Sequence, residues 1–522
     1  MRAMRFQTVV AFVLALAIGA FCLLHGLGFM AGFNTVPLPA LSRLALGANA
    51  ESADKTVRPE VGRVFVVVVD GLRADFANRL ALQTPKGMPM GACQLEALLP
   101  SFSRPAYVAL STGVPPWASG VQTNDYKGTI ALPSVWEAAR AAGIPTRLVS
   151  DGTDWWTELF PTAFDKVDIV DKRDFDARWD ALALPSHGTA ALVLIHIVAA
   201  DDEAHDFGTG AAYEREIARA GVKIQRIIGD LDPTRDTLLV TADHGHIARG
   251  GHGGPEPEVM AVPLVVFGAG VVPYPSRRNE GREGANEWCG SLIDLPASIA
   301  SRLDIAPPPA SMGSLLPVLV PINDQFSAKL ARQSLTVHDA LGAMALDAFG
   351  HHRMRVASLR ATGVGVALWF VLSLGCAFVF VVGPKRRSIA SALLPGLVFV
   401  AAYALLEPTL SLSAVWLENP WTLRIGAIAG VAALVASLVV FRRHAPHEAL
   451  VLVAIGALLP FIIAVFAHGS LTAGPVLGEP HAAFAIIVAD LFASATIGVA
   501  LVVAIIAMAR ERRRGRASVW TS

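Results

Sequence analysis

Long apolar runs occupy both ends of the chain, and a region of shorter apolar runs separated by polar segments lies between them. The first long run, at about 9–29, is long enough to cross a bilayer, and Arg2 and Arg5 precede it. Five further candidate spans follow at about 362–383, 388–406, 423–441, 449–467 and 483–509. This pattern predicts an N-terminal anchor helix and a C-terminal bundle of about five transmembrane helices.

The first apolar run could also belong to a cleaved signal peptide, because Ala48-Asn49-Ala50 resembles a small-residue cleavage site. That tripeptide lies about twenty residues beyond the apolar run, which is too far for ordinary cleavage. An uncleaved signal anchor is therefore the favoured interpretation.

Positive charges in the short loops predict the orientation in the membrane. Lys and Arg follow the second, fourth and sixth runs at 385–387, 442–443 and 510–516, whereas the loops 407–422 and 468–482 contain neither. Because cytoplasmic loops carry the excess of Lys and Arg, we expect a multi-pass protein of the plasma (inner) membrane with both termini in the cytoplasm. Asp490, inside the sixth run, is either a packing residue or a contact to a lipid head group or substrate.

The middle region alternates between strand and helix patterns. Runs of largely apolar residues at 64–69, 192–198, 237–241 and 263–267 are typical of strands buried on both faces. Helical patterns lie between them, for example at 134–142 and 213–228. The alternation predicts an α/β fold, with a mostly parallel sheet sandwiched by helices.

These patterns divide the chain into six segments. The expected segments are an anchor (1–32), a linker (33–59), an extracytoplasmic domain (60–320), a juxtamembrane helical linker (321–360), a five-helix transmembrane domain (361–510) and a basic cytoplasmic tail (511–522).

Composition adds two constraints. The 522 residues carry 43 Lys+Arg and 43 Asp+Glu, so net charge gives no support for binding a nucleic-acid duplex. Cys93 and Cys289 fall in the middle region, where export would allow one disulfide, although two free buried thiols are equally compatible with the sequence.

Polar side chains gather where the predicted strands end. The set contains three carboxylates, three imidazoles and one hydroxyl: Asp70, Ser103, Asp201, His205, Asp243, His244 and His252. Binding sites in such sheets lie at the carboxyl ends of the strands, so we expect these side chains to share one site. The set can hold two divalent ions, which together clamp the oxygens of a phosphoryl group, and imidazole with carboxylate suits Zn²⁺.

Each segment also has a simpler interpretation. Asp70-Gly71 is ordinary turn chemistry, and Ser103, beside Pro105 and a helix-like stretch at 106–110, has the properties of a helix N-cap. Asp201 and His205 share a helix face by their spacing of four, whereas His196 within the strand fits a core histidine better than a ligand.

The acids next to Asp201 and His205 are alternative ligands, namely Asp202, Glu203 and Asp206. The strongest local signal is Asp243-His244-Gly245 followed by the glycine-flanked His252, because glycines let the backbone bend close to an ion. His246 is a spare imidazole that fits a partner of a metal ligand.

The motifs VVVVDGLRAD, PSFSRPAYVALSTG, DDEAHDFG, TADHGH and GGHGG, in this order over residues 60–320, resemble the alkaline phosphatase superfamily. The resemblance is to the branch of nucleotide pyrophosphatase/phosphodiesterases and GPI ethanolamine phosphate transferases, and it implies an alkaline-phosphatase-like fold. It implies that Asp70, Ser103, Asp243 and His244 hold one zinc ion and that Asp201, His205 and His252 hold the other. It further implies that Ser103 is the nucleophile and that Asn124 contacts a phosphate oxygen.

The sequence departs from the family pattern at three places. Ser103-Arg104-Pro105 is closer to the transferases than to the phosphodiesterases, whereas Asn124 is closer to the phosphodiesterases. Ala204 stands where a glycine is usual, and His246 stands where a methionine is common.

The leading hypothesis is a membrane-anchored dinuclear-metal phosphodiesterase or phosphatase that acts outside the cytoplasm through a phosphoserine at Ser103. The alternative is a phosphoethanolamine-type head-group transferase acting on a lipid or glycan, and a second alternative is a non-enzymatic membrane scaffold. The expected partners are the lipid bilayer and a phosphate ester, with phospholipids and nucleotides as candidates.

Overall fold

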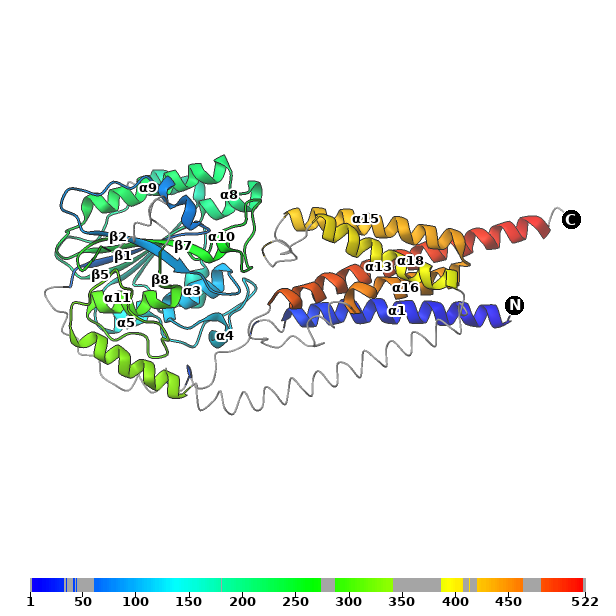
Figure 1. The fold of residues 1–522 in the computed structure, drawn as a ribbon, viewed down its shortest axis with the longest axis horizontal. Coiled ribbons are helices and arrows are strands. Elements are labelled where there is room, and N and C mark those ends of the chain that lie inside the picture. Colours follow the sequence, from blue (N-terminus) through cyan, green and yellow to red (C-terminus); the bar gives the residue numbers. More distant parts are fainter. Residues whose placement is uncertain are drawn as a thin grey trace. The chain divides into compact units, whose positions relative to one another are not determined.

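The computed structural model describes residues 2–31, 34, 41, 42, 44, 61–179, 181–273, 287–340, 386–406, 413, 420–462 and 480–519. The chain divides into two compact units. One unit is Asn34–Phe349, and the other combines Met1–Phe33 with Gly350–Ser522 (Figure 1).

The unit Asn34–Phe349 is built on an eight-stranded sheet in the order β4-β3-β5-β1-β6-β7-β2-β8. The strands are β1 (Arg63–Val69), β2 (Met90–Glu96), β3 (Thr146–Asp151), β4 (Lys166–Val170), β5 (Ala191–Ile197), β6 (Thr237–Thr241), β7 (Ala261–Gly268) and β8 (Trp288–Ser291). Neighbouring strands pair in parallel except where β7 pairs with β6 and β2. The expected mostly parallel α/β sheet is therefore confirmed.

The predicted strands form the centre of the sheet. Strands β1, β5 and β6 are buried along their whole length, as their largely apolar runs predict. The fourth predicted run forms β7, which is the antiparallel member. Strands β2, β3, β4 and β8 were not predicted, because their sequences lack a long apolar run; β4, for example, buries only Val170 fully.

Helices cover both faces of the sheet, with α8 and α9 on one side and α5 and α11 on the other (Figure 1). The helices are α3 (Ser103–Thr112), α4 (Pro116–Ser119), α5 (Val135–Ala141), α6 (Trp155–Leu159), α7 (Lys172–Trp179), α8 (Ala199–Phe207), α9 (Ala211–Asp230), α10 (Pro257–Met260) and α11 (Leu295–Leu303), with 3-10 turns η1 (Ala74–Leu80) and η2 (Leu292–Asp294). Ser134 begins α5 with a capping box to Glu137, which satisfies two otherwise unpaired backbone amides. Residues 325–340 form a further helix within the helical linker expected at 321–360, of which 341–360 lies outside the described residues.

A disulfide joins Cys93 on β2 to Cys289 on β8, 196 residues apart in the sequence. The structure therefore selects the disulfide over the two free thiols that the sequence also allowed. It pins the short edge strand β8 to its neighbour.

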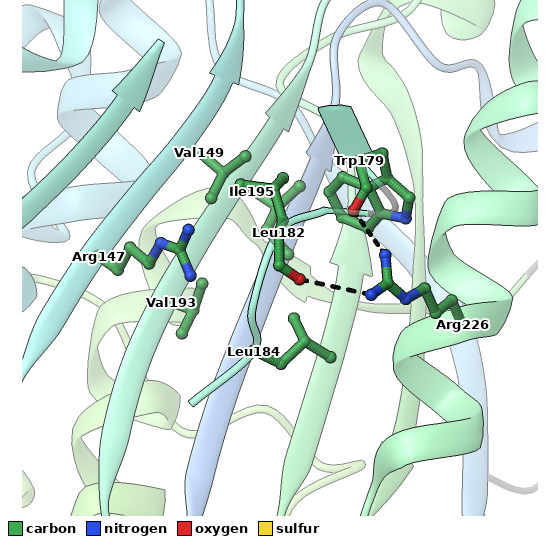
Figure 2. Close-up of a pocket in the computed structure, with 8 residues that line it drawn as sticks. All are labelled: Arg147, Val149, Trp179, Leu182, Leu184, Val193, Ile195 and Arg226. Carbon is green, nitrogen blue, oxygen red and sulfur yellow. Dashed lines mark hydrogen bonds between the residues drawn. The ribbon is translucent and has the colours of Figure 1, made fainter. Parts of the chain in front are cut away.

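A small pocket lies between β3, β5 and the segment 179–184 (Figure 2). Its lining includes Arg147, Val193, Leu184 and Arg226, and none of the predicted site residues. Arg226 donates to the carbonyl oxygens of Trp179 at 2.5 Å and Leu182 at 3.4 Å. These bonds attach the segment to α9, so we interpret the pocket as a packing feature.

The second unit contains α1 (Arg2–Ala31), α13 (Arg386–Leu406), α15 (Pro420–Arg443), α16 (Pro446–Ala457) and α18 (Pro480–Val519). Two stretches of the described residues, Phe6–Leu27 and Val488–Arg510, are long and apolar enough to cross a membrane. Predicted spans 388–406, 423–441 and 483–509 fall in α13, α15 and α18, and the first part of span 449–467 falls in α16. Span 362–383 and the end of span 449–467, at 463–467, lie outside the described residues. The five-helix C-terminal bundle thus remains a prediction.

Asp490 on α18 is fully buried and pairs with His25 on α1 at 2.7 Å. Gly26 allows this close approach, since a Cβ there would lie 3.1 Å from that of Asp490. Of the two interpretations of Asp490, this contact favours helix packing.

Candidate metal centre

The polar residues gather at the carboxyl ends of the three central strands. Asp70 directly follows β1, Asp243 follows β6 by two residues, and Asp201 lies in the first turn of α8 after β5. Because β1 pairs with both β5 and β6 in parallel, the three acids meet at one edge of the sheet.

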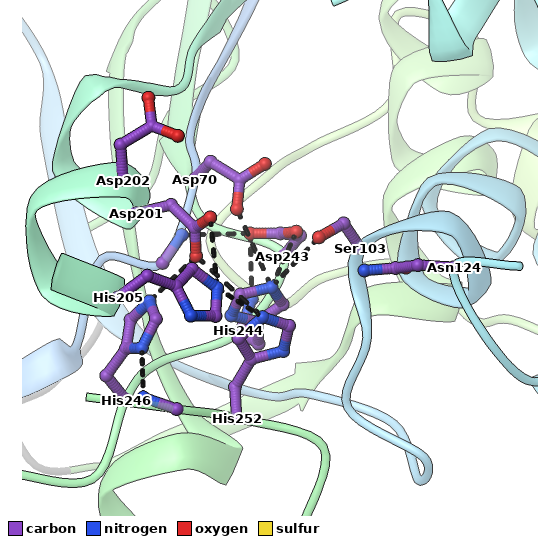
Figure 3. A network of polar contacts seen from close by, with 12 residues as sticks. Asp70, Ser103, Asn124, Asp201, Asp202, His205, Asp243, His244, His246 and His252 are labelled. Carbon is purple, nitrogen blue, oxygen red and sulfur yellow. Dashed lines mark hydrogen bonds and ion pairs between the residues drawn. The ribbon is translucent and has the colours of Figure 1, made fainter. Parts of the chain in front are cut away.

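All seven predicted ligands come together there (Figure 3). Three sets of described side chains have ligand atoms within 4.8 Å of one another: Asp70 with Asp243 and His244; Asp201 with His244 and His252; and Asp201 with His205 and His246. Ser103 Oγ lies 3.2 Å from His244 Nε2, which attaches the serine to the same cluster. These buried Asp and His groups fit a metal centre.

Two carboxylate oxygens in this cluster have no hydrogen-bond partner. Asp70 Oδ1 and Asp243 Oδ2 are both buried, whereas Asp243 Oδ1 accepts from the backbone amides of Gly71 at 3.1 Å and His244 at 3.0 Å. Burial, together with the charges of Asp70 and Asp201, raises the pKa of Asp243 well above its usual range. A cation at these oxygens would offset that cost, because buried charges in proteins are paired or bind metals.

The histidines present the tautomer that a metal needs. The Nδ1 atoms of His244 and His252 face the carbonyl oxygens of Gly245 at 3.2 Å and Ser101 at 2.9 Å. A carbonyl only accepts, so each Nδ1 carries the proton and each Nε2 has a free lone pair. Burial lowers the pKa of His244 to about 4, which keeps its imidazole neutral at physiological pH.

His205 and His252 form a second pair of imidazoles, close to the carboxylate of Asp201. His205 Nε2 lies 3.1 Å from His252 Nε2 and 3.5 Å from Asp201 Oδ2. Burial opposes ionisation of Asp201, but His205 and His246 outweigh it and hold the pKa of that carboxyl well below its usual range. A carboxylate and two imidazole nitrogens facing one point are suitable ligands for zinc.

Two residues that the sequence did not assign to the site support Asp70. Tyr107 donates to Asp70 Oδ2 at 2.5 Å, and His196 Nε2 lies 3.0 Å from the same oxygen. This leaves Oδ1 for a metal. His196 is buried, as expected of a core histidine, but it also contacts a ligand. Tyr107 stands four residues after Ser103 on α3, so helical spacing could have identified it.

Ser103 is the first residue of α3, and the N-cap position belongs to Phe102. The N-cap interpretation of Ser103 is therefore wrong. The residue is 4% exposed, and its side chain turns toward His244. The amino end of α3 adds a positive partial charge where a phosphate would lie.

Asn124 lies beside Ser103 (Figure 3). Its Oδ1 accepts from the backbone amide of Arg104 at 3.0 Å, so its Nδ2 is the atom left to donate to another group. Asn34 holds the same loop, because its Oδ1 accepts from the amides of Gln122 at 2.9 Å and Thr123 at 3.0 Å. No sequence pattern predicted this role of Asn34.

The alternative acid Asp202 turns away from the cluster (Figure 3) and pairs with Lys172. Arg104, next to Ser103, is also occupied elsewhere, since it pairs with Glu158 at 2.5 Å and stacks on Trp155. Neither residue belongs to the predicted ligand set.

Comparison with known proteins adds the family context. No protein-family model matches the chain. It is 26% identical over 314 residues to GPI ethanolamine phosphate transferase 1 of Yarrowia lipolytica, which covers 51% of this chain and 32% of the relative. The human GPI ethanolamine phosphate transferase 3 catalytic subunit is 23% identical over 313 residues, with coverages of 53% and 28%. The expected resemblance to these transferases is confirmed.

The chain spans about a third of the length of the curated relatives it matches. Among solved structures, the C-terminal periplasmic domain of EptC from Escherichia coli matches with a TM-score of 0.34 and 12% identity, over 49% of this chain and 85% of that domain. No inference about this chain rests on that low score.

Proposed function

We propose that this chain is a membrane-anchored phosphoethanolamine-type transferase, which moves a head group from a phospholipid to a lipid or glycan hydroxyl. The observation that carries the proposal is the convergence of Ser103 with Asp70, Asp243 and His244 at one edge of the sheet. The sequence alone favoured a hydrolase; the named relatives favour the transferase alternative.

The proposed ligand sets are those that the family resemblance implies, and the proximity of these side chains supports them. Asp70, Ser103, Asp243 and His244 would hold one ion, and Asp201, His205 and His252 would hold the other. We propose Zn²⁺ for both, because the donors are imidazole and carboxylate. When bound, the ions supply Lewis-acid stabilisation of the phosphoryl charge and lower the pKa of the serine hydroxyl.

The protein residues then perform a two-step transfer. Ser103 Oγ loses its proton to solvent and attacks phosphorus in line, and the bond to the diacylglycerol oxygen breaks as that oxygen takes up a proton. The acceptor hydroxyl then displaces Ser103, losing its proton as Ser103 regains one. The amino end of α3 and the Asn124 amide stabilise the equatorial phosphoryl oxygens in both steps.

The membrane arrangement is part of the proposal. Two helices long enough to span a bilayer and the Cys93–Cys289 disulfide support an anchored, exported catalytic unit. We propose the plasma (inner) membrane, a multi-pass layout of six spans and cytoplasmic termini, with 60–320 as the extracytoplasmic domain.

Hydrolysis to a free head group remains the second candidate, because Asn124 matches the phosphodiesterase segment. In a hydrolase, water would replace the acceptor hydroxyl in the second step. No observation favours the non-enzymatic scaffold.

The test uses phosphatidylethanolamine with a labelled head group, membrane extract, and the full-length protein in three forms. The native protein should move label to a lipid or glycan fraction, whereas Ser103→Ala should abolish transfer and retain bound zinc. Ser314→Ala, at an exposed serine, is the matched control and should behave like the native protein. Retained turnover in Ser103→Ala would refute the nucleophile, and release of only free head group would replace the transferase with the hydrolase.

A further inference from the structure

We propose that His246 is a positioning residue that fixes Asp201 as a metal ligand and does not itself bind metal. The proposal rests on the metal centre of the proposed function. His246 is fully buried at the centre, two residues after His244, where the family pattern commonly has methionine. Its Nε2 lies 2.7 Å from Asp201 Oδ1, and its Nδ1 lies 3.1 Å from the backbone nitrogen of Gly251.

The partners of His246 determine which ring nitrogen carries the proton. The Gly251 amide can only donate, so Nδ1 must offer its lone pair. In a neutral imidazole the proton is then on Nε2, which donates to Asp201 Oδ1. His246 therefore has no free lone pair to offer a metal.

This tautomer is the opposite of that in the ligand histidines. His244 and His252 donate through Nδ1 to backbone carbonyls and keep Nε2 free. Backbone partners at Nδ1 thus divide these histidines into two kinds: those with a free Nε2 lone pair and one, His246, whose Nε2 carries the proton. They do so although the Asp201, His205 and His246 ligand atoms lie within 4.8 Å of one another, close enough to share an ion.

The bond to His246 also decides how Asp201 presents its oxygens. With Oδ1 held by His246, Oδ2 faces His205 Nε2 at 3.5 Å. Loss of that bond would free the carboxylate to rotate. A methionine cannot replace it, because a thioether donates no hydrogen bond.

The surrounding backbone leaves room for this ring. Gly71 has a φ of +69°, and a Cβ on it would lie 2.6 Å from His246 Nε2. The edge of the His246 ring also meets His205, with centroids 5.1 Å apart and an interplanar angle of 87°. His246 is held from several sides, as a residue that orients a ligand must be.

Two substitutions separate a positioning role from a ligand role. His246→Gln keeps one amide N–H that can donate to Asp201 and one carbonyl that can accept from Gly251, but it removes the imidazole nitrogens. His246→Met introduces the residue that the family commonly carries and removes the donor. His338→Gln, at an exposed histidine, is the matched control.

The experiment measures zinc bound per full-length chain in detergent, by elemental analysis during titration with a competing chelator. We expect native-like zinc affinity at both sites for His246→Gln and the control. We expect His246→Met to lose about 10–100-fold in affinity at one of the two sites.

Each outcome decides the proposal. Equal losses in His246→Gln and His246→Met would show that the imidazole nitrogen binds metal, and native affinity in His246→Met would show that no positioning is needed. Either result overturns the role of His246 and leaves the metal centre standing. Native protein that binds no zinc would instead overturn the proposed function. Circular dichroism identifies any variant that fails to fold, and His246→Gln then carries the test.

Discussion

Strands β1 and β6 lie side by side in the sheet, and each has a buried charged residue at both ends. At their amino ends Arg63 pairs with Asp236, with Nη2 lying 2.6 Å from Oδ2. At their carboxyl ends Asp70 and Asp243 meet in the candidate metal centre. The same two strands therefore carry acids paired with an arginine at their amino ends and acids without Lys or Arg partners at their carboxyl ends.

The cluster at the amino ends is satisfied by protein groups alone. Asp236 accepts from the backbone and guanidinium of Arg63 and from the amide of Asp232. Arg63 also pairs with Asp230 at 2.7 Å. Such a buried pair holds the strands in place, and removal of one partner is costly.

The cluster at the carboxyl ends contains no cationic partner of that kind. Among the described residues, the partners of Asp70, Asp201 and Asp243 are histidines, a tyrosine and backbone amides, without Lys or Arg. Buried acids without a cationic partner cost stability, and a bound cation would offset that cost. The two clusters thus differ in whether protein groups alone compensate their charge.

The largest expected effect comes from Asp243→Asn. The amide can still accept from Gly71 and His244, but it is a weaker metal ligand, so we expect zinc at one site to be lost and turnover to fall about a thousandfold. The metal-free protein should gain stability at pH 7, because the folded state disfavours the ionised Asp243. Zinc analysis and thermal melts with chelator test this. Asp236→Asn should have the opposite effect: a lower melting temperature and an unchanged zinc content. If both variants change melting temperature and zinc content in the same direction, the two clusters do not have separate roles.

Arg63→Met should cost about 3–5 kcal/mol of unfolding free energy, because it leaves Asp236 buried without its cation. Zinc content of the folded fraction should stay native. Denaturant unfolding followed by tryptophan fluorescence measures the first quantity, and elemental analysis measures the second. The double variant Arg63→Met, Asp236→Leu should recover part of the loss, and zinc loss in folded Arg63→Met would contradict separate roles for the two edges.

Asp151, at the end of β3, is a buried acid at the carboxyl edge that belongs to none of the metal groups. Burial raises its pKa to about 6 from 3.8, so the free energy of unfolding falls as pH rises from about 4 to about 6. Asp151→Asn keeps an acceptor for the Val198 amide and should gain roughly 3 kcal/mol above pH 6 and nothing below pH 4. Melts across this pH range test it beside the exposed control Asp154→Asn. A gain that persists at pH 4 would contradict the charge as its cause.

The centre of the fold was predictable because burial on both faces requires largely apolar runs. The valine-rich run of β1 and the acid after it mark both a strand and a ligand. The edge strands β4 and β8 were not predictable. An edge strand pairs with one neighbour, so its sequence needs fewer apolar residues than that of a central strand. Edge strands are held by their neighbours rather than by their own composition.

Several of the proposed ligands were identifiable in the sequence because they follow a strand end or adjoin a glycine, as Asp70, Asp243 and His252 do. The supporting residues were not, because a partner such as Tyr107 or Asn34 depends on tertiary placement. The residues of the centre do not distinguish water from a hydroxyl as acceptor, because the two proposed reactions would use the same nucleophile and the same metals. The named relatives supplied the preference for transfer.

The bond between Cys93 and Cys289 links the folding of this unit to the redox state of its compartment. Thiols stay reduced in the cytosol and oxidise beyond the membrane, so a chain retained inside would lack this covalent link between β2 and β8. Alkylation of these two sulfurs before and after reduction therefore tests, without any engineered tag, whether residues 60–320 fold outside the cytoplasm as proposed.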